Sequence, residues 1–328
     1  MALREITEPV DLCDRRGRLN PAAVGWTRTP LHRSNLRGWG RTKRWEHWGV
    51  VTPRHVVGLT VSSLDYAGVH GIYVLDRATG IETRRDVVAP LAARAQLPEH
   101  SGGGPVRAAA GGLLISTDDS LESTRLHARA DGVQVDLVVE RPEPHESLGV
   151  VVPWSERLFQ YTVKDVARRV AGRMVVAGQE HRVEAEDSWA VLDHGRGRWP
   201  YAVTWNWGAG SGVVDDVVVG LQLGGQWTDG TGASENALVV DGRLHPLDEL
   251  LEWDYDTRDP SRPWRIRGQH VDVALEPFHQ RVATTNLGVL ASHTHQSFGH
   301  WSGHVVVDGR QLPVDGLVGW AEEARQRW

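Results

Sequence analysis

The sequence predicts an all-β protein whose antiparallel sheets close into barrels or sandwiches. Three Asp-Gly pairs lie between alternating runs, in "LHARADGVQVDLVVE", "NALVVDGRLHPL" and "GHVVVDGRQLPV". Asp-Gly is favoured in two-residue hairpin turns because both central residues need positive φ. Helical periodicity is scarce, so strands follow one another through hairpins without crossover helices.

Individual elements follow from the local patterns. Runs that alternate apolar and polar residues, or that are rich in β-branched residues, predict strands. The predicted strands lie at 54–66, 70–76, 157–164, 172–184, 213–225, 270–278 and 286–301, beside the three hairpins at 126–140, 236–247 and 303–314. The segment "GLVGWAEEARQRW" predicts a short helix near 316–327, and "DVVAPLAARAQL" allows another over 86–97.

Charge, cysteine content and the lengths of apolar runs exclude several classes of function. The chain has 328 residues, with 36 basic and 42 acidic side chains, and this acidic balance argues against a nucleic-acid partner. Cys13 is the single cysteine, so neither a disulfide framework nor a cysteine zinc site is expected. No apolar run is typical of a signal peptide or a membrane span, which predicts a cytoplasmic protein. The domain boundary is predicted near "VVPWSERLFQYTVK", which gives β domains at 1–155 and 156–328.

The stretch "LDHGRGRWPYAVTWNWGAGSG" is the first candidate site. Its odd positions from 199 predict a strand with one aromatic face, and they hold Trp199, Tyr201, Val203, Trp205 and Trp207. Beside them lie Asp193, His194, Arg196 and Arg198, charged or titratable groups that are costly in a dry core. We therefore expect the stretch to line a cavity with Asp193 as its acid. The alternative is an Asp193–arginine pair that fixes a turn.

The Gly-rich segment "GQWTDGTGASEN" is the second candidate site. It contains Trp227, Asp229, Glu235 and Asn236, and loops at barrel mouths commonly contact ligands. Asp193 with Glu235 or Asp229 would form the carboxylate pair of a glycosidase. The alternative is an ordinary turn whose Asp and Thr bond their own backbone.

Histidines and basic residues form two further clusters. "SHTHQSFGHWSGH" places His293 and His295 on one strand face, but two histidines are a weak metal signal, so we expect His295 or His300 to hydrogen-bond in a pocket and no metal to bind. "RGWGRTKRWEHW" combines Arg37, Arg41, Lys43 and Arg44 with Trp39, Trp45 and Trp48. The acidic chain favours a plug or rim over a nucleic-acid platform. No hydrolase elbow, P-loop or dinucleotide fingerprint occurs, and no cofactor is predicted.

Several segments resemble a bacterial family, domain of unknown function 2804. They are "EITEPVDLCDRRGRLNPAAVGWTRTPLHRSNLRGWGRTKRWEHW", "ESLGVVVPWSERLFQYTVK", "VLDHGRGRWPY", "LGGQWTDGTGASENALVVDG", "FGHWSG" and "GWAEEARQRW". More distantly, "GRMVVAGQEHRVEAEDSWAVLDHGRG" resembles carotenoid 1,2-hydratases and related double-lipocalin proteins, although Gly195 stands where that pattern has an acidic residue. The resemblance implies two lipocalin-like barrels.

Three functions remain open at this point. The first is a hydratase, cyclase or isomerase that acts on a lipophilic small molecule, with terpenoids among the candidates, Asp193 as the acid and the aromatic residues as the wall of the site. His194 would assist Asp193. The second is a glycoside-active enzyme, and the third a non-catalytic protein that binds a hydrophobic ligand. The oligomeric state is left open.

Overall fold

The computed structural model describes residues 3–259, 261–286 and 291–328, and throughout these residues the chain is built from β-strands. A single 3-10 turn, η1 (Pro21–Ala23), interrupts the strands. Among the described residues, no helix has the length and apolar character needed to span a membrane. The predicted all-β class, with lipocalin-like antiparallel sheets, is confirmed.

The chain divides into two compact units, an amino-terminal unit, Arg4–Trp199, and a carboxy-terminal unit that runs from Pro200 to Trp328. The division falls between Trp199 and Pro200, whereas the sequence placed it at 155/156. The reason is the pairing of β14 (Phe159–Val176), which follows the predicted boundary. This strand is bonded to β12 (Val133–Glu140) and β16 (Trp189–Arg198), so it belongs to the first sheet.

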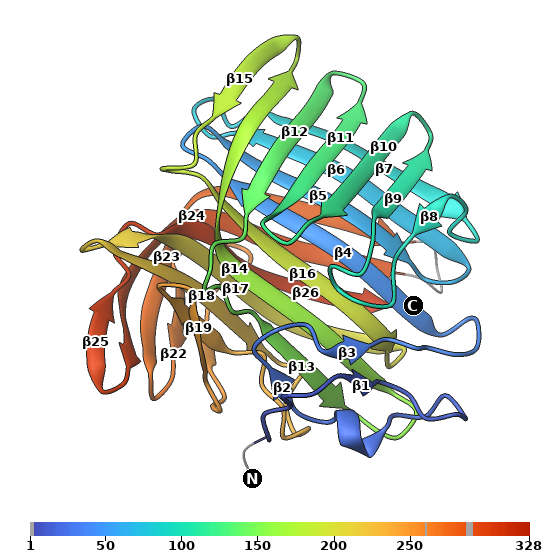
Figure 1. The fold of residues 1–328 in the computed structure, drawn as a ribbon. Helices are drawn as coiled ribbons and strands as arrows, with labels where there is room; N and C mark the ends of the chain where they lie inside the picture. The colour runs from blue at the N-terminus through green and yellow to red at the C-terminus, as the bar shows by residue number, and fades with distance from the viewer. Residues whose placement is uncertain (1–2, 260, 287–290) are drawn as a thin grey trace. The chain divides into compact units, whose positions relative to one another are not determined.

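The amino-terminal unit holds one large curled sheet and a small parallel pair (Figure 1). In the large sheet, strands that are neighbours in the following order are hydrogen-bonded to each other: β7-β6-β5-β4-β16-β14-β12-β11-β10-β9-β8. The other strands of this unit are β1 (Val10–Asp11), β2 (Trp26–Thr27), β3 (His32–Arg33), β4 (Thr42–Val51), β5 (His55–Ser63), β6 (Ala67–Asp76), β7 (Glu82–Pro90), β8 (Ala95–Gln96), β9 (Val106–Ala110), β10 (Leu113–Asp119), β11 (Ser123–Ala130), β13 (Leu148–Pro153) and β15 (Gln179–Val183).

Two apolar clusters stabilise this unit. The larger one joins strands from both arms of the curled sheet, for example Trp48 and Ile72 from one arm with Ile115 and Leu137 from the other. The smaller one packs the amino-terminal segment, including Leu12, against Tyr161 and its neighbours on β14. The sequence predicts a plug or rim over residues 37–48, but residues 42–48 form part of β4, which pairs with β16 and β5 within the large sheet.

The carboxy-terminal unit is a second curled sheet with the path β20-β19-β18-β17-β26-β24-β23-β22-β21, and β25 pairs with β24. Its strands are β17 (Ala202–Val214), β18 (Val217–Gly225), β19 (Ala237–Val240), β20 (Arg243–Pro246), β21 (Glu252–Asp254), β22 (Trp264–Arg267), β23 (Val271–Asn286), β24 (Ala291–Val307), β25 (Arg310–Pro313) and β26 (Val318–Arg327). Its core includes Leu221, Ile266, Leu275 and Trp301. Residues 287–290 of the strand predicted over 286–301 lie outside the described residues.

All three Asp-Gly hairpins are confirmed. The pairs Ala130↔Val133, Val240↔Arg243 and Val307↔Arg310 close them with two-residue turns. In the second and third turns both residues have positive φ, between 45° and 77°, as the favoured hairpin turn requires.

Both predicted helices are wrong. Residues 318–327 form strand β26, which is bonded on both sides, to β17 and to β24. Residues 86–97 continue β7 and then turn. Good helix formers such as Ala and Glu predicted the helices. Strand pairing, of β26 with β17 and β24 and of β7 with β6, outweighs intrinsic propensities of less than about 1 kcal/mol per residue.

Candidate active site

Asp193 lies in the middle of β16 and takes part in a network of side chains from three adjacent strands. Its carboxylate accepts hydrogen bonds from Trp45 Nε1 at 2.9 Å and Thr162 Oγ1 at 3.2 Å. Lys164 Nζ lies 3.1 Å from the same carboxylate, and the two side chains are only 7% and 14% exposed. Asp193 thus pairs with a lysine across the sheet, so the expected alternative of an arginine partner within a turn is wrong.

The strand register places Asp193 and His194 on opposite faces of the sheet. Asp193 is directly paired with Lys164 and with His47, while His194 is paired with Glu46. Directly paired residues of antiparallel strands share a face, and consecutive residues alternate. The two adjacent residues therefore belong to two different polar clusters.

The cluster on the second face is closed. His194 is fully buried, and its Nδ1 lies 3.2 Å from Glu46 Oε2. Burial, together with the charge of Arg196, lowers the pKa of His194 to about 4. Burial alone would raise the pKa of Glu46, but the His194 hydrogen bond and the Arg196 charge outweigh it and lower that pKa.

Arg196 completes this buried cluster. Its guanidinium donates to the carbonyl oxygens of Pro98, Trp45 and Gly195, and burial lowers its pKa to about 10. The Glu46 carboxylate thus lies near both a neutral histidine and a guanidinium that is bound to three carbonyls, which is a structural arrangement. It holds the strands together.

Glycines beside Asp193 make room for protein side chains. A Cβ on Gly195 would lie 2.1 Å from the Trp45 ring, and one on Gly197 would lie 2.4 Å from Gln160 Oε1. In the carboxy-terminal unit, Trp301 fills the same kind of space beside Gly210. Close approach is the reason for these glycines, as expected, but the approaching group is an aromatic or amide side chain.

The predicted single strand over 199–207 is wrong. β16 ends at Arg198, β17 begins at Ala202, and Pro200 lies between them. Pro200 lacks the N–H that a continuous ladder needs. The predicted aromatic wall is therefore divided: Trp199 belongs to the amino-terminal unit, where Nε1 donates to Gln160 Oε1 at 2.6 Å. Tyr201, Trp205 and Trp207 belong to the carboxy-terminal unit.

Within the carboxy-terminal unit, Trp205 and Trp207 point to one face of β17. Trp205 Nε1 donates to Glu322 Oε1, and Trp207 Nε1 donates to Gln222 Oε1, each at 2.9 Å. The Trp207 ring meets Trp320 edge-on at 5.1 Å between centroids. Tyr201 is 48% exposed.

The loop after β18 has mainly structural contacts. Trp227 Nε1 donates to the buried Glu235 carboxylate, and Asn236 Oδ1 accepts from the backbone N–H of Gly224 at 2.6 Å. Asp229 is exposed at a turn, where its own backbone N–H bonds the Gln226 carbonyl. Neither unit by itself contains both Asp193 and one of the carboxylates proposed as its glycosidase partner.

The histidines of β24 bond to each other. His293 Nε2 and His295 Nε2 are 2.7 Å apart, and His293 Nδ1 lies 2.8 Å from Thr284 Oγ1. The His300 ring lies 5.4 Å from that of Phe278. Within residues 3–259, 261–286 and 291–328, His, Cys, Asp and Glu form no group of three or more that could hold a metal ion.

Nearly the whole sequence matches one known protein family. The family described as Domain of unknown function (DUF2804) matches residues 3–328. The chain belongs to this family. No curated protein matches the sequence.

Two solved structures share the fold of this DUF2804 protein. Kievitone hydratase from Nectria haematococca is 11% identical, with a TM-score of 0.53, and the match covers 88% of this chain and 89% of that one. A protein from Nitrosomonas europaea described as AttH is 13% identical, with a TM-score of 0.51, over 86% and 92% of the two chains. The TM-scores show a common fold with these two proteins, which agrees with the double-lipocalin resemblance.

Sequence reasoning missed three members of the Asp193 network of this DUF2804 protein, namely Trp45, Thr162 and Lys164. A signal was present for each group. In "RWEHW", Trp45 and His47 share one face of the strand, and Arg44 and Glu46 lie on the other. "YTVKD" places a lysine in a segment that is otherwise typical of a buried strand. Lysine is rarely buried without a partner, so Lys164 predicted a nearby carboxylate that the sequence could not identify.

Proposed function

We propose that this DUF2804 protein is an enzyme of the hydratase or cyclase kind that acts on a lipophilic small molecule, and that Asp193 and Lys164 are its acid–base pair. The observation that carries the proposal is the nearly buried ion pair in the middle of a sheet. Burying two charges costs several kcal/mol of desolvation per ion, so such pairs are more frequent at functional sites than in ordinary cores. The fold shared with a hydratase is consistent with this proposal.

The network suits proton transfer in both directions. In the direction of water loss, Asp193 takes a proton from carbon while Lys164 gives one to the leaving hydroxyl, which departs as water and leaves a C=C bond. Water addition is the reverse: protonated Asp193 gives its proton to the alkene carbon, and neutral Lys164 takes one from the attacking water. Trp45 and Thr162 hold the carboxylate in place, and the Trp45 ring offers a face to a developing cation.

The test is turnover of a panel of lipophilic alkenes and alcohols, terpenoids included, in ¹⁸O-labelled water with mass detection. With at least one substrate we expect either a gain of about 20 mass units, from addition of ¹⁸O-labelled water, or a loss of about 18, from elimination of unlabelled water. The rate should fall about 100-fold or more in Asp193→Asn and Lys164→Met, the range for removal of a general acid or base. Asp136→Asn is the matched control because Asp136 forms a surface pair with Arg125.

Circular dichroism and thermal unfolding show whether each variant is folded. A folded Asp193→Asn variant with wild-type turnover would contradict the proposal. Ligand binding without turnover by the wild type would favour the non-catalytic binding protein instead.

A further inference from the structure

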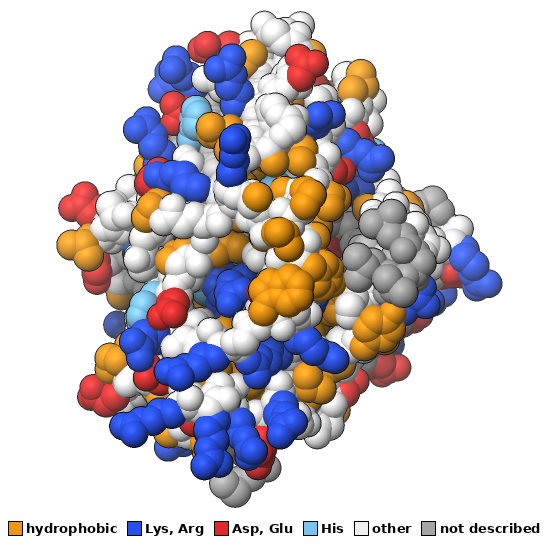
Figure 2. Space-filling view, turned by 90° about the vertical axis from the view of Figure 1, so that its right-hand side faces the viewer, with side chains coloured by type: hydrophobic (Ala, Val, Ile, Leu, Met, Phe, Trp, Pro, Cys, Tyr) orange, Lys and Arg blue, Asp and Glu red, His pale blue; other side chains and the backbone are white. Residues whose placement is uncertain are grey.

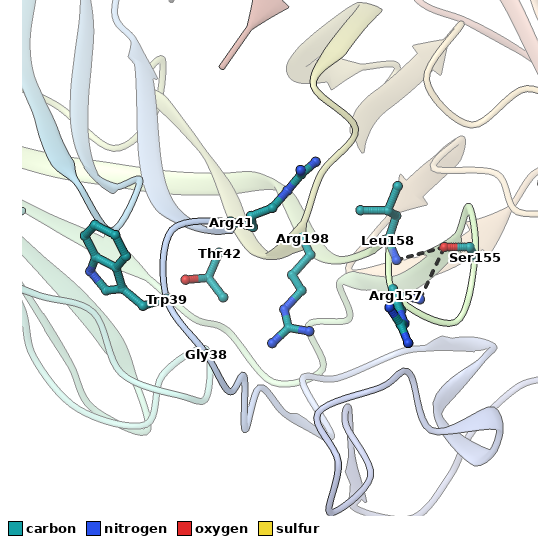
Figure 3. A pocket seen from close by; sticks show the side chains of 8 residues that line it. All are labelled: Gly38, Trp39, Arg41, Thr42, Ser155, Arg157, Leu158 and Arg198. Atoms are coloured by element: carbon teal, nitrogen blue, oxygen red, sulfur yellow. Dashed lines mark hydrogen bonds between the residues drawn. The ribbon is translucent and has the colours of Figure 1, made fainter.

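A cavity in the amino-terminal unit is lined by three arginines and by none of the residues of the Asp193 network. It has a volume of about 600 Å³ and lies between the loop at 38–42, the turn at 155–158 and the end of β16. Its lining residues are Gly38, Trp39, Arg41, Thr42, Ser155, Arg157, Leu158 and Arg198 (Figure 3). None of them is acidic, although the chain as a whole carries more acidic than basic residues.

Arg198 is held by the backbone on one side. Its Nη1 donates to the Gly17 carbonyl oxygen at 3.0 Å. Cβ atoms on Gly17 and Gly38 would lie 3.5 and 3.1 Å from Nη2, and both glycines have positive φ, +73° and +90°. A Cβ on Gly38 would be tight against the guanidinium, whereas the distance from Gly17 is that of an ordinary van der Waals contact, so it is Gly38 that leaves room for Arg198.

Arg41 and Arg157 sit on anchored backbone. The carboxylate of Asp65 accepts the backbone N–H groups of Gly40 at 2.7 Å and Thr42 at 3.1 Å, one on each side of Arg41. Ser155 Oγ accepts the N–H groups of Arg157 and Leu158, at 3.2 and 3.0 Å (Figure 3). Three separate segments are thus fixed so that each contributes one arginine.

These arginines differ in their partners from several other arginines of the unit. Arg18, Arg33 and Arg54 each pair with a carboxylate. By contrast, within the described part of the chain the side chains of Arg41 and Arg157 have no hydrogen bond or ion pair, and Arg198 has only the Gly17 carbonyl. Figure 2 shows Lys and Arg side chains gathered on the lower part of the face it presents.

We propose that this cavity is a binding site for the phosphate group of a small organic phosphate. Guanidinium groups bind phosphate oxygens in a bidentate manner. Three arginines line this cavity and no carboxylate does, so the lining suits a doubly charged anion. Leu158 and the 70% exposed indole of Trp39 provide apolar surface beside the arginines for the organic part. The volume lies in the range of small-molecule sites, and the site does not depend on the proposed hydratase activity.

Isothermal titration calorimetry tests this with three probes, namely inorganic phosphate, inorganic pyrophosphate and phenyl phosphate. We expect binding that weakens about ten-fold or more in Arg41→Gln and Arg157→Gln, as for loss of a charge-assisted hydrogen bond. Arg54→Gln, which removes an arginine paired with Asp76, should bind as the wild type does.

Trp39→Ala separates the two sources of phosphate. A weaker affinity for phenyl phosphate alone supports an organic phosphate, whereas equal binding of all probes in this variant assigns the site to free phosphate and overturns the organic part. Absence of binding at millimolar concentration, or unchanged binding in Arg41→Gln and Arg157→Gln, would overturn the site. So would binding of a single-stranded oligonucleotide in place of all three probes.

Discussion

At the residue scale, polar side chains in this protein have two different roles although they are adjacent in the chain. Asp193 faces a network that includes a lysine, and His194 is enclosed with Glu46 and Arg196. Burial costs little free energy for a neutral imidazole, whereas it destabilises the charged imidazolium because that form loses its hydration. His194 therefore makes the stability of the fold depend on pH.

The first prediction concerns this pH dependence. Because the pKa of His194 is about 4 in the folded protein and about 6.5 in an unfolded chain, protonation favours the unfolded state. The stability that comes from neutral His194 is complete above pH 6.5 and is lost as the pH falls towards 4. Urea unfolding at pH 7 and pH 4.5 should show a smaller loss in His194→Gln than in the wild type.

The control is His127→Gln, since His127 is only partly buried on β11. Its loss of stability between the two pH values should match that of the wild type. His55, whose pKa burial also lowers to about 4, remains in both variants, so some acid sensitivity persists. An unchanged acid dependence in His194→Gln would show that His194 is not kept neutral.

At the element scale, β26 shows how strand pairing overrides local preference. Its sequence is rich in helix formers, yet it is bonded to β17 on one side and β24 on the other. Ala321 is fully buried and is paired with Gly208 and Ser297. A strand in this position has every backbone N–H in a ladder.

We predict that Ala321→Pro destabilises the carboxy-terminal unit severely, because proline removes a ladder hydrogen bond and is hardly ever found in the middle of a sheet. Ala321→Gly keeps the N–H and should cost only about 1 kcal/mol. Thermal unfolding and far-ultraviolet circular dichroism compare the two. Equal stability of the proline and glycine variants would mean that the segment is not a central strand.

At the scale of the whole molecule, the two units have separate apolar cores. Leu137 lies in the core of the amino-terminal unit and Leu221 in that of the carboxy-terminal unit, and both side chains are fully buried. Truncation of a buried leucine to alanine costs about 2–5 kcal/mol through lost transfer energy and the cavity that is left.

We predict that each substitution destabilises mainly the unit in which it lies. Hydrogen exchange, followed by mass spectrometry, should accelerate mainly within Arg4–Trp199 for Leu137→Ala and mainly within Pro200–Trp328 for Leu221→Ala, since opening occurs in cooperative parts of a structure. The two variants serve as controls for each other. Equal acceleration in both units by either variant would show a single cooperative molecule.

The sequence alone determined the β class, because period-two alternation and Asp-Gly turns are local properties that need no knowledge of distant residues. It also located Asp193, whose polar neighbours and flanking glycines are unusual in one short stretch. It did not separate Asp193 from His194, because the strand was predicted from 199 onward, whereas both residues lie within β16, where consecutive residues point to opposite faces.

Only the tertiary structure decided the partners and the boundaries. Trp45, Thr162 and Lys164 reach Asp193 across strand pairs that join residues up to 148 positions apart, and no local pattern encodes such pairing. In the same way, the segment at 318–327 is a strand because β17 and β24 supply its hydrogen-bond partners. Those partners are contributed by distant parts of the chain, so a local reading of residues 318–327 could only weigh helix propensity.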